Sequence, residues 1–452
     1  MRLAWFTPWP PQPSGIAGRS AELSGLLALR GCGIDISVDE RHVPALPRLP
    51  DEAVAPGTVR VQSAHDFVWR HARGQYDLVV YQVGNSRHHD FMWPYLFRFP
   101  GLVVLHDARL HHARARILLR TGGAARYRAE LANDHPDLPR DAAELAVHGF
   151  DGRYYGMWPM TRAVVESARG VAVHSRGGCD QLAADHPDQF IRYLPLGEGR
   201  MAPVDATARQ EMRIRHGAND AAVIFGVFGG LSADKRVAEI FAAFAATRRR
   251  HPHARLWLAG SADRTTDVQA LTARYALHDA VTPLGFLDDE AFDTALAAVD
   301  ISLNLRWPSA TETSGPWLRA LALGVPTVIL ELAHQAHLPA LDPRDWRPRN
   351  AADPQAPITI AVDILDEHHS LVLAMDRLAS DPLLRQRLGS DGRAYWALHH
   401  TPERMADAYL PLLSTTASRE APAVTLPASL RPDMWHRART LMAPFGVTTD
   451  LT

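Results

Sequence analysis

Lysine is almost missing from this sequence of 452 residues. Lys235 is the single lysine, and every other residue among the 48 counted as Lys or Arg is an arginine. Either cation serves at most surface positions, so a position that stays lysine favours a need for a compact ammonium rather than a planar guanidinium. The scarcity therefore marks Lys235 as a candidate functional residue.

Cysteine and long apolar runs are scarce as well. The two cysteines, Cys32 and Cys179, lie far apart and form no disulfide framework, which favours a reducing compartment. No apolar run approaches the ~20 residues that a membrane-spanning helix needs. The short run Leu3–Phe6 near the N-terminus predicts a strand rather than a signal peptide. We therefore expect a cytoplasmic protein.

Neither sign of charge dominates. The chain has 48 Lys plus Arg against 50 Asp plus Glu, and 46% of its residues are hydrophobic. This balance excludes a uniformly basic nucleic-acid binder and an acidic disordered chain, so we expect no nucleic-acid partner. The stretch 108–129 contains six arginines and no acid. It is either a solvated helix face or a peripheral membrane contact.

Signature motifs of several enzyme classes are also missing. The 23 histidines show neither the HExxH spacing nor a Cys/His finger, so we expect no metal site. A P-loop, a GxSxG elbow, a catalytic-cysteine signature and a dinucleotide-binding GxGxxG are all lacking. None of the activities that these motifs carry is indicated.

Short apolar segments alternate with helical patterns along most of the chain. The expected strands are Leu3–Phe6, Leu78–Gln82, Leu102–Leu105, Val171–Val173, Val223–Phe228, Arg255–Ala259, Ile301–Leu305 and Thr327–Leu330. The expected helices are Arg19–Leu29, Val237–Arg248, Asp289–Val299 and Trp317–Leu323, with others between Ile364 and Leu413 and weak helical character at Met434–Leu441. Strands separated by such helices predict an α/β fold with parallel sheets covered on both faces.

The alternation begins afresh after residues 194–203, which are rich in proline and glycine. We therefore expect two doubly wound, Rossmann-like domains, 1–198 and 199–395. A C-terminal helix and tail, 396–452, would follow, the helix packing back on the first domain. Ligands of such folds bind at the carboxyl ends of the strands, so a cleft between the domains is the expected site.

The single lysine lies in a glycine-containing turn. Gly229 and Gly230 follow a strand, and Lys235 and Arg236 open the next helix. The side chain of Ser232 or Asp234 would cap that helix. Glycines let backbone amides approach a ligand, and a helix N-terminus favours anions, so the turn predicts a diphosphate site. The alternative is an ordinary turn with a solvated Lys-Arg pair.

A second loop follows the expected strand Ile301–Leu305. It ends in Glu312, Thr313, Ser314 and Gly315, directly before a helix. Backbone amides in such a loop bind a phosphate, a carboxylate or a row of hydroxyls, and a carboxylate accepts hydrogen bonds from the vicinal hydroxyls of a hexose. The alternative is a carboxylate that only caps the helix.

Two loops of the first half also follow strands. His106 stands at the end of one, where an imidazole can donate to a ligand oxygen or serve a structural purpose. Ser14 and Gly15 precede a helix and either present backbone amides to a phosphate or form a proline-stiffened turn.

Taken in order, these motifs resemble the retaining glycosyltransferases of family 4, which have the GT-B fold. Pro-Ser-Gly-Ile-Ala after the first strand, Tyr81-Gln-Val-Gly-Asn-Ser86 and Leu105-His-Asp107 are similar to the N-terminal half of a bacterial subgroup. The Gly-Gly turn with Lys235, Pro283-Leu-Gly-Phe-Leu287 and the Glu-Thr-Ser-Gly helix start are similar to its donor-binding half. The resemblance spans residues 1–415.

The resemblance implies a role for each of these residues. Lys235 would bind the donor's diphosphate, and Ser14 and Gly15 would reach it from the opposite domain. His106 would lie beside the transferred sugar, and Glu312 would hold sugar hydroxyls. The further donor-binding residues that it implies are Gly229, Gly230, Arg236, Phe286, Leu287, Thr313, Ser314 and Gly315.

Phe286 and Leu287 would frame the nucleotide base. Two other positions of this chain depart from the family's usual residues. The family usually has an arginine five residues before the lysine, where this chain has Gly230, and Arg236 is the candidate substitute. The family also has a second glutamate eight residues after the first, where Arg319 stands. That arginine either contacts an extra phosphate or pairs with an acid.

The resemblance implies transfer of a sugar from a nucleotide-diphosphate donor to a saccharide or lipid-linked acceptor, with retention. It implies no metal and no cofactor other than the donor, and a place in the synthesis of cell-surface polysaccharide or glycolipid. Two alternatives are a nucleotide-sugar epimerase of the same fold and a non-catalytic scaffold that has lost donor binding.

Overall fold

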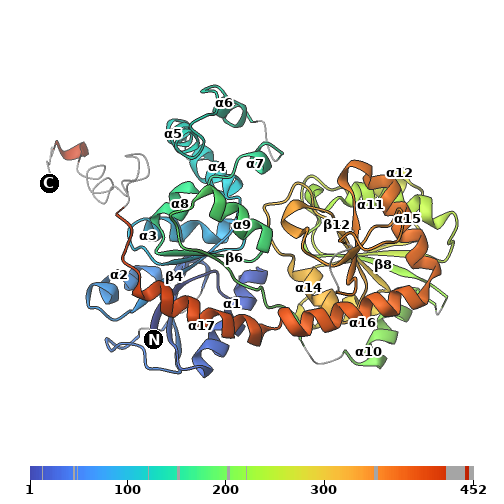
Figure 1. Ribbon diagram of the computed structural model, residues 1–452, viewed down its shortest axis with the longest axis horizontal. Coiled ribbons are helices and arrows are strands. Elements are labelled where there is room, and N and C mark those ends of the chain that lie inside the picture. The colour runs from blue at the N-terminus through green and yellow to red at the C-terminus, as the bar shows by residue number, and fades with distance from the viewer. Residues whose placement is uncertain are drawn as a thin grey trace. The chain divides into compact units, whose positions relative to one another are not determined.

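The computed structural model describes residues 1–12, 14–43, 46–47, 49–120, 122–149, 153–200, 204–219, 221–350, 355–423 and 443–446. The expected helical segment Met434–Leu441 lies outside these residues. The chain forms two compact units, and Figure 1 shows their elements. Unit 1 comprises Met1–Val173, Leu182–Arg192 and the described part of Leu410–Thr452, and unit 2 comprises His174–Gln181 and Tyr193–Tyr409.

Unit 1 is built on a seven-stranded sheet with the order β3-β2-β1-β4-β5-β6-β7. Its strands are β1 (Arg2–Phe6), β2 (Gly33–Val38), β3 (Val59–Ser63), β4 (Leu78–Val83), β5 (Leu102–Leu105), β6 (Gly170–Val173) and β7 (Ile191–Tyr193). The pairings from β3 through β6 are parallel, as expected. Among the strands of these pairings, β2 and β3 were not expected from the sequence.

The helices of unit 1 lie mostly between consecutive strands. They are α1 (Gly15–Leu29), α2 (Ala64–Ala72), α3 (Trp93–Leu96), α4 (His111–Arg120), α5 (Ala124–Asp134), α6 (Ala142–Val147), α7 (Arg153–Met157) and α8 (Arg162–Ser167). Two further helices, α9 (Arg176–Asp185) and α17 (Pro402–Ser418), have residues in both units. Figure 1 shows α4 to α7 gathered to one side of the sheet, where they have a small hydrophobic core of their own.

The arginine-rich stretch 108–129 falls on α4 and α5, and it is not a uniform solvated face. Arg114 is buried, and its Nη2 donates to Glu130 Oε2 at 2.7 Å. Arg116 Nη1 lies 2.5 Å from Asp90 Oδ2. The expectation of a plain solvated helix face is therefore wrong for Arg114, because its charge is neutralised inside the protein.

Unit 2 repeats the architecture with the strand order β10-β9-β8-β11-β12-β14-β13. Its strands are β8 (Ile224–Phe228), β9 (Arg255–Ala259), β10 (Val281–Gly285), β11 (Ile301–Asn304), β12 (Thr327–Leu330), β13 (Ala340–Leu341) and β14 (Thr359–Val362). Its helices are α10 (Ala206–Arg215), α11 (Val237–Arg248), α12 (Val268–Arg274), α13 (Asp289–Ala298), α14 (Gly315–Ala322), α15 (Glu367–Ser380) and α16 (Pro382–His399).

Both faces of the second sheet are covered, which explains its continuous apolar strands. Phe225 and Val227 of β8 pack with α11 and α15 on one face, whereas Ile224 and Phe228 pack with α10, α13 and α14 on the other. Alternate residues of a strand point to opposite faces, so every position of β8 is buried. Burying one such side chain contributes about 1.5–3 kcal/mol.

In each sheet the strand order reverses beside the first strand. The reversal lies between β1 and β4 in unit 1 and between β8 and β11 in unit 2. The loops that leave two such strands diverge to opposite faces of the sheet and leave a crevice at their carboxyl ends, where ligands of doubly wound folds bind. The loops after β8 and β11 are those that carry Lys235 and Glu312.

None of the helices in the described ranges is both long and apolar enough to cross a membrane.

Candidate functional site

The loop between β8 and α11 holds the single lysine against the edge of the sheet. Lys235 Nζ donates a hydrogen bond to the backbone oxygen of Phe228 at 2.6 Å. Gly229 has a φ of +88°, and a Cβ there would lie 2.6 Å from this Nζ atom. Glycine at 229 therefore allows the ammonium to lie on the carboxyl end of β8. At Gly230 a Cβ would have open space, with Ser261 O the nearest atom at 4.0 Å.

Lys235 is half-buried, and burial destabilises its charge. Burial, followed by the positive charge of Arg306, lowers the pKa of Lys235 to about 7, while Asp234 and Glu312 act in the opposite direction. An anion bound beside the ammonium would raise this pKa again. The position is therefore suited to a negatively charged group.

Arg236 is held by carboxylates. It occupies the N-cap position of α11 with a φ of +59°. Its Nη2 lies 2.8 Å from Glu239 Oε1 and 2.5 Å from Glu367 Oε2. Its charge is matched by two acids, and its contact with a diphosphate stays a prediction. The expected cap from 232–234 is wrong, because no side chain caps this helix.

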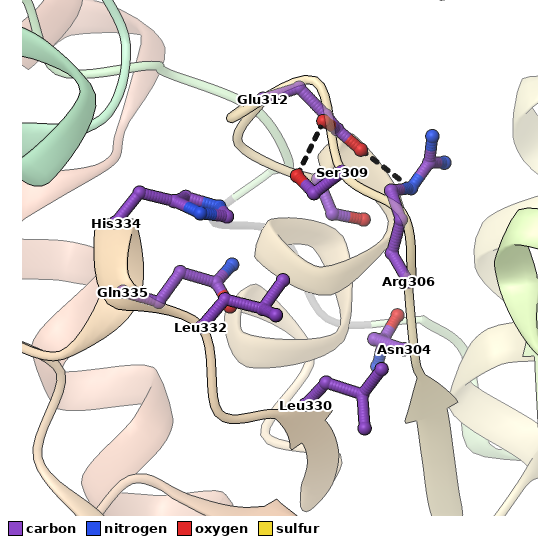
Figure 2. Close-up of a pocket in the computed structure, with 9 residues that line it drawn as sticks. Asn304, Arg306, Ser309, Glu312, Leu330, Leu332, His334 and Gln335 are labelled. Carbon is purple, nitrogen blue, oxygen red and sulfur yellow. Dashed lines mark hydrogen bonds and ion pairs between the residues drawn. The ribbon is translucent and has the colours of Figure 1, made fainter. Parts of the chain in front are cut away.

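The loop between β11 and α14 connects to the lysine loop through Arg306 and through a backbone hydrogen bond from Trp307 N to Asp234 O at 2.7 Å. Arg306 Nε lies 2.7 Å from Glu312 Oε1, and Arg306 Nη1 lies 3.1 Å from Asp234 Oδ2. Ser309 Oγ donates to Glu312 Oε2 at 2.9 Å, and Figure 2 shows both contacts of this carboxylate. Since Asp234 directly precedes Lys235, Arg306 joins the two loops.

The start of α14 is capped by Ser314. Its Oγ accepts a hydrogen bond from Trp317 N at 3.4 Å, and Gly315 is the first residue of the helix. Thr313 Oγ1 donates to His174 O at 2.7 Å, which anchors the loop. The alternative that Glu312 serves only as a helix cap is therefore wrong.

A small, open hollow lies at the carboxyl ends of β11 and β12. Figure 2 shows its lining. The lining residues are Asn304, Arg306, Ser309, Glu312, Ser314, Leu330, Leu332, His334 and Gln335. Convergent polar groups beside a small apolar surface are the lining that a polar ligand of sugar size requires.

Sequence reasoning missed several residues of this hollow. Asn304 is the last residue of β11, Arg306 belongs to the loop that leads to Glu312, and His334 and Gln335 follow β12. The signal that could have found them is position alone, since all four lie at or just past the carboxyl ends of neighbouring parallel strands.

Arg319 and the segment after β10 complete the set in unit 2. Arg319 Nε lies 2.7 Å from Asp293 Oδ1, and its Nη1 lies 2.9 Å from Asp289 Oδ1. Of the two alternatives for this arginine, pairing with acids is therefore the one that the structure shows. Phe286 is 72% exposed at the end of β10, whereas Leu287 packs against the core.

The three candidate residues of unit 1 lie at the carboxyl edge of its sheet. Ser14 Oγ caps α1 by accepting from Ile16 N at 3.3 Å. A Cβ at Gly15 would meet nothing within 4 Å. His106 Nε2 lies 2.7 Å from Gln82 Oε1, so a neutral amide orients the imidazole.

Within the described ranges, no group of three or more His, Cys, Asp or Glu side chains is arranged to hold a metal ion.

Comparison with known sequences gives one match. Residues 222–340 match the family model described as glycosyl transferases group 1. The matched segment contains the loops that carry Lys235 and Glu312 and all the residues that line the hollow. No curated protein matches the chain in sequence.

Comparison with solved structures establishes the GT-B fold and confirms the expected fold class. Sucrose-phosphate synthase from Thermosynechococcus elongatus is 17% identical with a TM-score of 0.62, and the match covers 92% of this chain and 98% of that one. HepE of Anabaena, in complex with UDP and glucose, is 14% identical with a TM-score of 0.59 and coverages of 92% and 100%. WaaG, a glycosyltransferase involved in lipopolysaccharide biosynthesis, is 14% identical with a TM-score of 0.58 and coverages of 90% and 98%.

Proposed function

We propose that this protein transfers a sugar from a nucleoside diphosphate donor to an acceptor hydroxyl. The observation that carries the proposal is the hollow beside the strand reversal of unit 2, which Arg306 and Glu312 line and near which Lys235 interacts with both charges. Cations there suit a diphosphate, and a carboxylate suits sugar hydroxyls. The group 1 match over residues 222–340 and the GT-B fold support the same function.

The proposed reaction breaks the bond between the anomeric carbon and a phosphate oxygen and forms a bond from that carbon to the acceptor oxygen. Negative charge grows on the leaving diphosphate while positive charge grows on the sugar. Lys235 and the backbone amides of Thr313, Ser314 and Gly315 at the N-terminus of α14 stabilise the leaving group. The acceptor proton passes to the leaving phosphate on the same face of the sugar, so the configuration is retained without a protein nucleophile or a metal.

The remaining candidate residues keep the roles that the resemblance implies. We assign Ser14 and Gly15 to the diphosphate, His106 to the transferred sugar, and Phe286 with Leu287 to the base. The exposed ring of Phe286 offers a face on which a base can stack.

The acceptor is proposed to be a saccharide or a lipid-linked glycan of the cell surface. WaaG is a glycosyltransferase involved in lipopolysaccharide biosynthesis, and the structure of HepE is a complex with UDP and glucose. Both support a first trial with UDP-glucose and a cell-surface glycan acceptor. A peripheral membrane contact through 108–129 belongs to the same proposal, and salt-dependent cosedimentation with anionic liposomes tests it.

The test begins with a thermal-shift screen of UDP, GDP, ADP and dTDP and their sugars. A ligand present at 100 times its Kd should stabilise the fold by about 2.7 kcal/mol. Transfer is then measured for the wild type, Glu312→Ala and the control Glu290→Ala, an exposed residue of α13. We expect a loss of about 100-fold for Glu312→Ala and less than about twofold for the control.

Three results would contradict the proposal. If no nucleoside diphosphate raises the melting temperature, the protein is a scaffold. If the donor alone is converted to an epimer, it is an epimerase. If Glu312→Ala transfers sugar as fast as the wild type, the hollow is not the donor site.

A further inference from the structure

Arg306 occupies the centre of the proposed donor site and is the more exposed partner in its ion pairs there. Its side chain is 35% exposed, whereas that of Glu312 is 11% exposed. Arg306 thus covers the carboxylate from the solvent side while also reaching Asp234 at 3.1 Å. It contacts an acid from each of the two loops that form the site.

This arrangement conflicts with the proposed use of Glu312. A carboxylate that holds sugar hydroxyls must offer its oxygens to them, but Ser309 donates to Oε2 and Arg306 lies 2.7 Å from Oε1. The Oε1 atom is buried, and no hydrogen bond from the described residues reaches it. The contact with Arg306 is therefore an ion pair with poor hydrogen-bond geometry, which is a contact that can be exchanged.

A diphosphate is a stronger partner for this guanidinium than either acid. A guanidinium binds phosphate oxygens through two parallel hydrogen bonds, and a diphosphate offers it more negative charge than a carboxylate. Arg306 also keeps its charge at every physiological pH. Arg306 contacts Asp234, the residue directly before Lys235, so both cations lie at the junction of the two loops.

We propose that Arg306 exchanges partners when the donor binds. Its guanidinium leaves Glu312 and Asp234 for the diphosphate, and this movement uncovers Glu312 for the sugar hydroxyls. Arg306 then supplies the second cation that neither Gly230 nor Arg236 provides, and sugar binding by Glu312 depends on the diphosphate. This inference rests on the proposed function.

The test is a double-mutant cycle on Kd for the tightest-binding of UDP, GDP, ADP and dTDP, measured by calorimetry. Arg306→Gln should weaken binding about 10-fold or more, because a charge-assisted contact is lost. Glu312→Gln should tighten binding about threefold or more, because the arginine is released from its competitor. In the Arg306→Gln background, Glu312→Gln should change Kd by less than about twofold.

The controls separate this exchange from general effects of charge and folding. Arg344→Gln removes an arginine that likewise bridges two acids, Asp342 at 2.7 Å and Asp363 at 3.0 Å, and it should leave Kd unchanged. Arg306→Lys restores the charge and should recover part of the affinity, even if Arg306→Gln lowers the melting temperature.

Two results overturn the exchange alone. One is a Kd for Arg306→Gln within about twofold of wild type. The other is a gain from Glu312→Gln that persists in full in the double variant, since a general charge effect would then explain it. If the wild type binds none of the four nucleotides, the proposed function fails and the exchange fails with it.

Discussion

The two sheets of this protein share the order of their first five strands but differ in the chemistry at their strand reversals. In unit 2, Lys235, Arg306 and Glu312 bring charges of both signs together at the ends of β8 and β11. In unit 1, the corresponding edge presents a hydrogen-bonded neutral pair, His106 with Gln82 at 2.7 Å, and a capping hydroxyl, Ser14. The fold thus provides two similar crevices, and the loop residues decide which ligand chemistry each one suits.

A second contrast lies between adjacent residues. Lys235 and Arg236 are neighbours in sequence, yet Lys235 lies on the end of β8, whereas Arg236 pairs with Glu239 and Glu367. Two adjacent cations thus have different partners, because the fold decides which acceptor each one meets.

The largest effect is expected from Lys235→Arg, which tests the charged crevice directly. A guanidinium is larger than an ammonium, and the Nζ position is so close to residue 229 that a Cβ there would lie 2.6 Å from it. We expect kcat/KM for sugar transfer to fall about 100-fold with little change in melting temperature. The reverse exchange at an exposed position, Arg250→Lys, is the control, and near-normal turnover of Lys235→Arg would show that any cation suffices.

The pH dependence of nucleotide binding is the next largest effect. The pKa of Lys235 is about 7 in the folded protein and 10.5 ordinarily, so between these values the unfolded chain binds the extra proton and the free energy of unfolding rises with pH. Binding of a diphosphate depends on pH in the opposite sense, because it needs the protonated ammonium. Above pH 7 we expect Kd to weaken up to about 10-fold per pH unit until the pKa of the complex is reached.

Calorimetric titrations of the wild type and Lys235→Arg across this pH window measure the effect. The arginine variant should show a flat profile, since a guanidinium does not titrate there. Equal slopes for both proteins would assign the pH dependence to another group.

His106→Ala tests the neutral edge of unit 1. If this edge serves the sugar and not the diphosphate, we expect transfer to slow about 10-fold while Kd for the nucleotide stays within about twofold. His148→Ala, an exposed histidine that pairs with Glu144, is the matched control. A large loss of nucleotide affinity would show that the edge with His106 serves the diphosphate as well as the sugar.

The smallest functional effect is expected from Arg236→Gln. It leaves Glu367 without its 2.5 Å partner, which should lower the free energy of unfolding by about 1–3 kcal/mol. Kd for the nucleotide should stay within about twofold of wild type. Thermal denaturation and calorimetry measure the two quantities. A large loss of affinity at unchanged stability would show that Arg236 binds the donor.

Much of the sheet in unit 2 could be predicted, because its strands are apolar on both faces. The segments Arg255–Ala259 and Thr327–Leu330 were predicted with the bounds that the structure has. Gly33–Val38 was missed because Asp35 interrupts its apolar pattern. That carboxylate is fully buried, and its pairing with Arg60 of β3 at 2.7 Å and a hydrogen bond from the Tyr76 hydroxyl at 2.9 Å make the burial tolerable.

The loops that carry the site were predictable from the sequence, but the ion pairs within the site were not. Scarcity pointed to Lys235, and position before a helix pointed to Glu312. Arg306 had no comparable signal, because its contact with Asp234 joins residues that are distant in sequence. The acid partners of Arg236 were not predictable, because its left-handed φ and its contact with Glu367 depend on the packing of α15 against α11.

The sequence by itself determined the alternation of strands and helices, and with it the placing of Gly229, Lys235 and Glu312 just past strand ends. These follow from local apolar periodicity and from the conformational freedom of glycine. The tertiary structure alone decided which charges a ligand can reach. Ion pairs form between side chains that the fold brings together, so the pairing of Arg236 and Arg319 with acids and the position of Arg306 over Glu312 are properties of the packed protein.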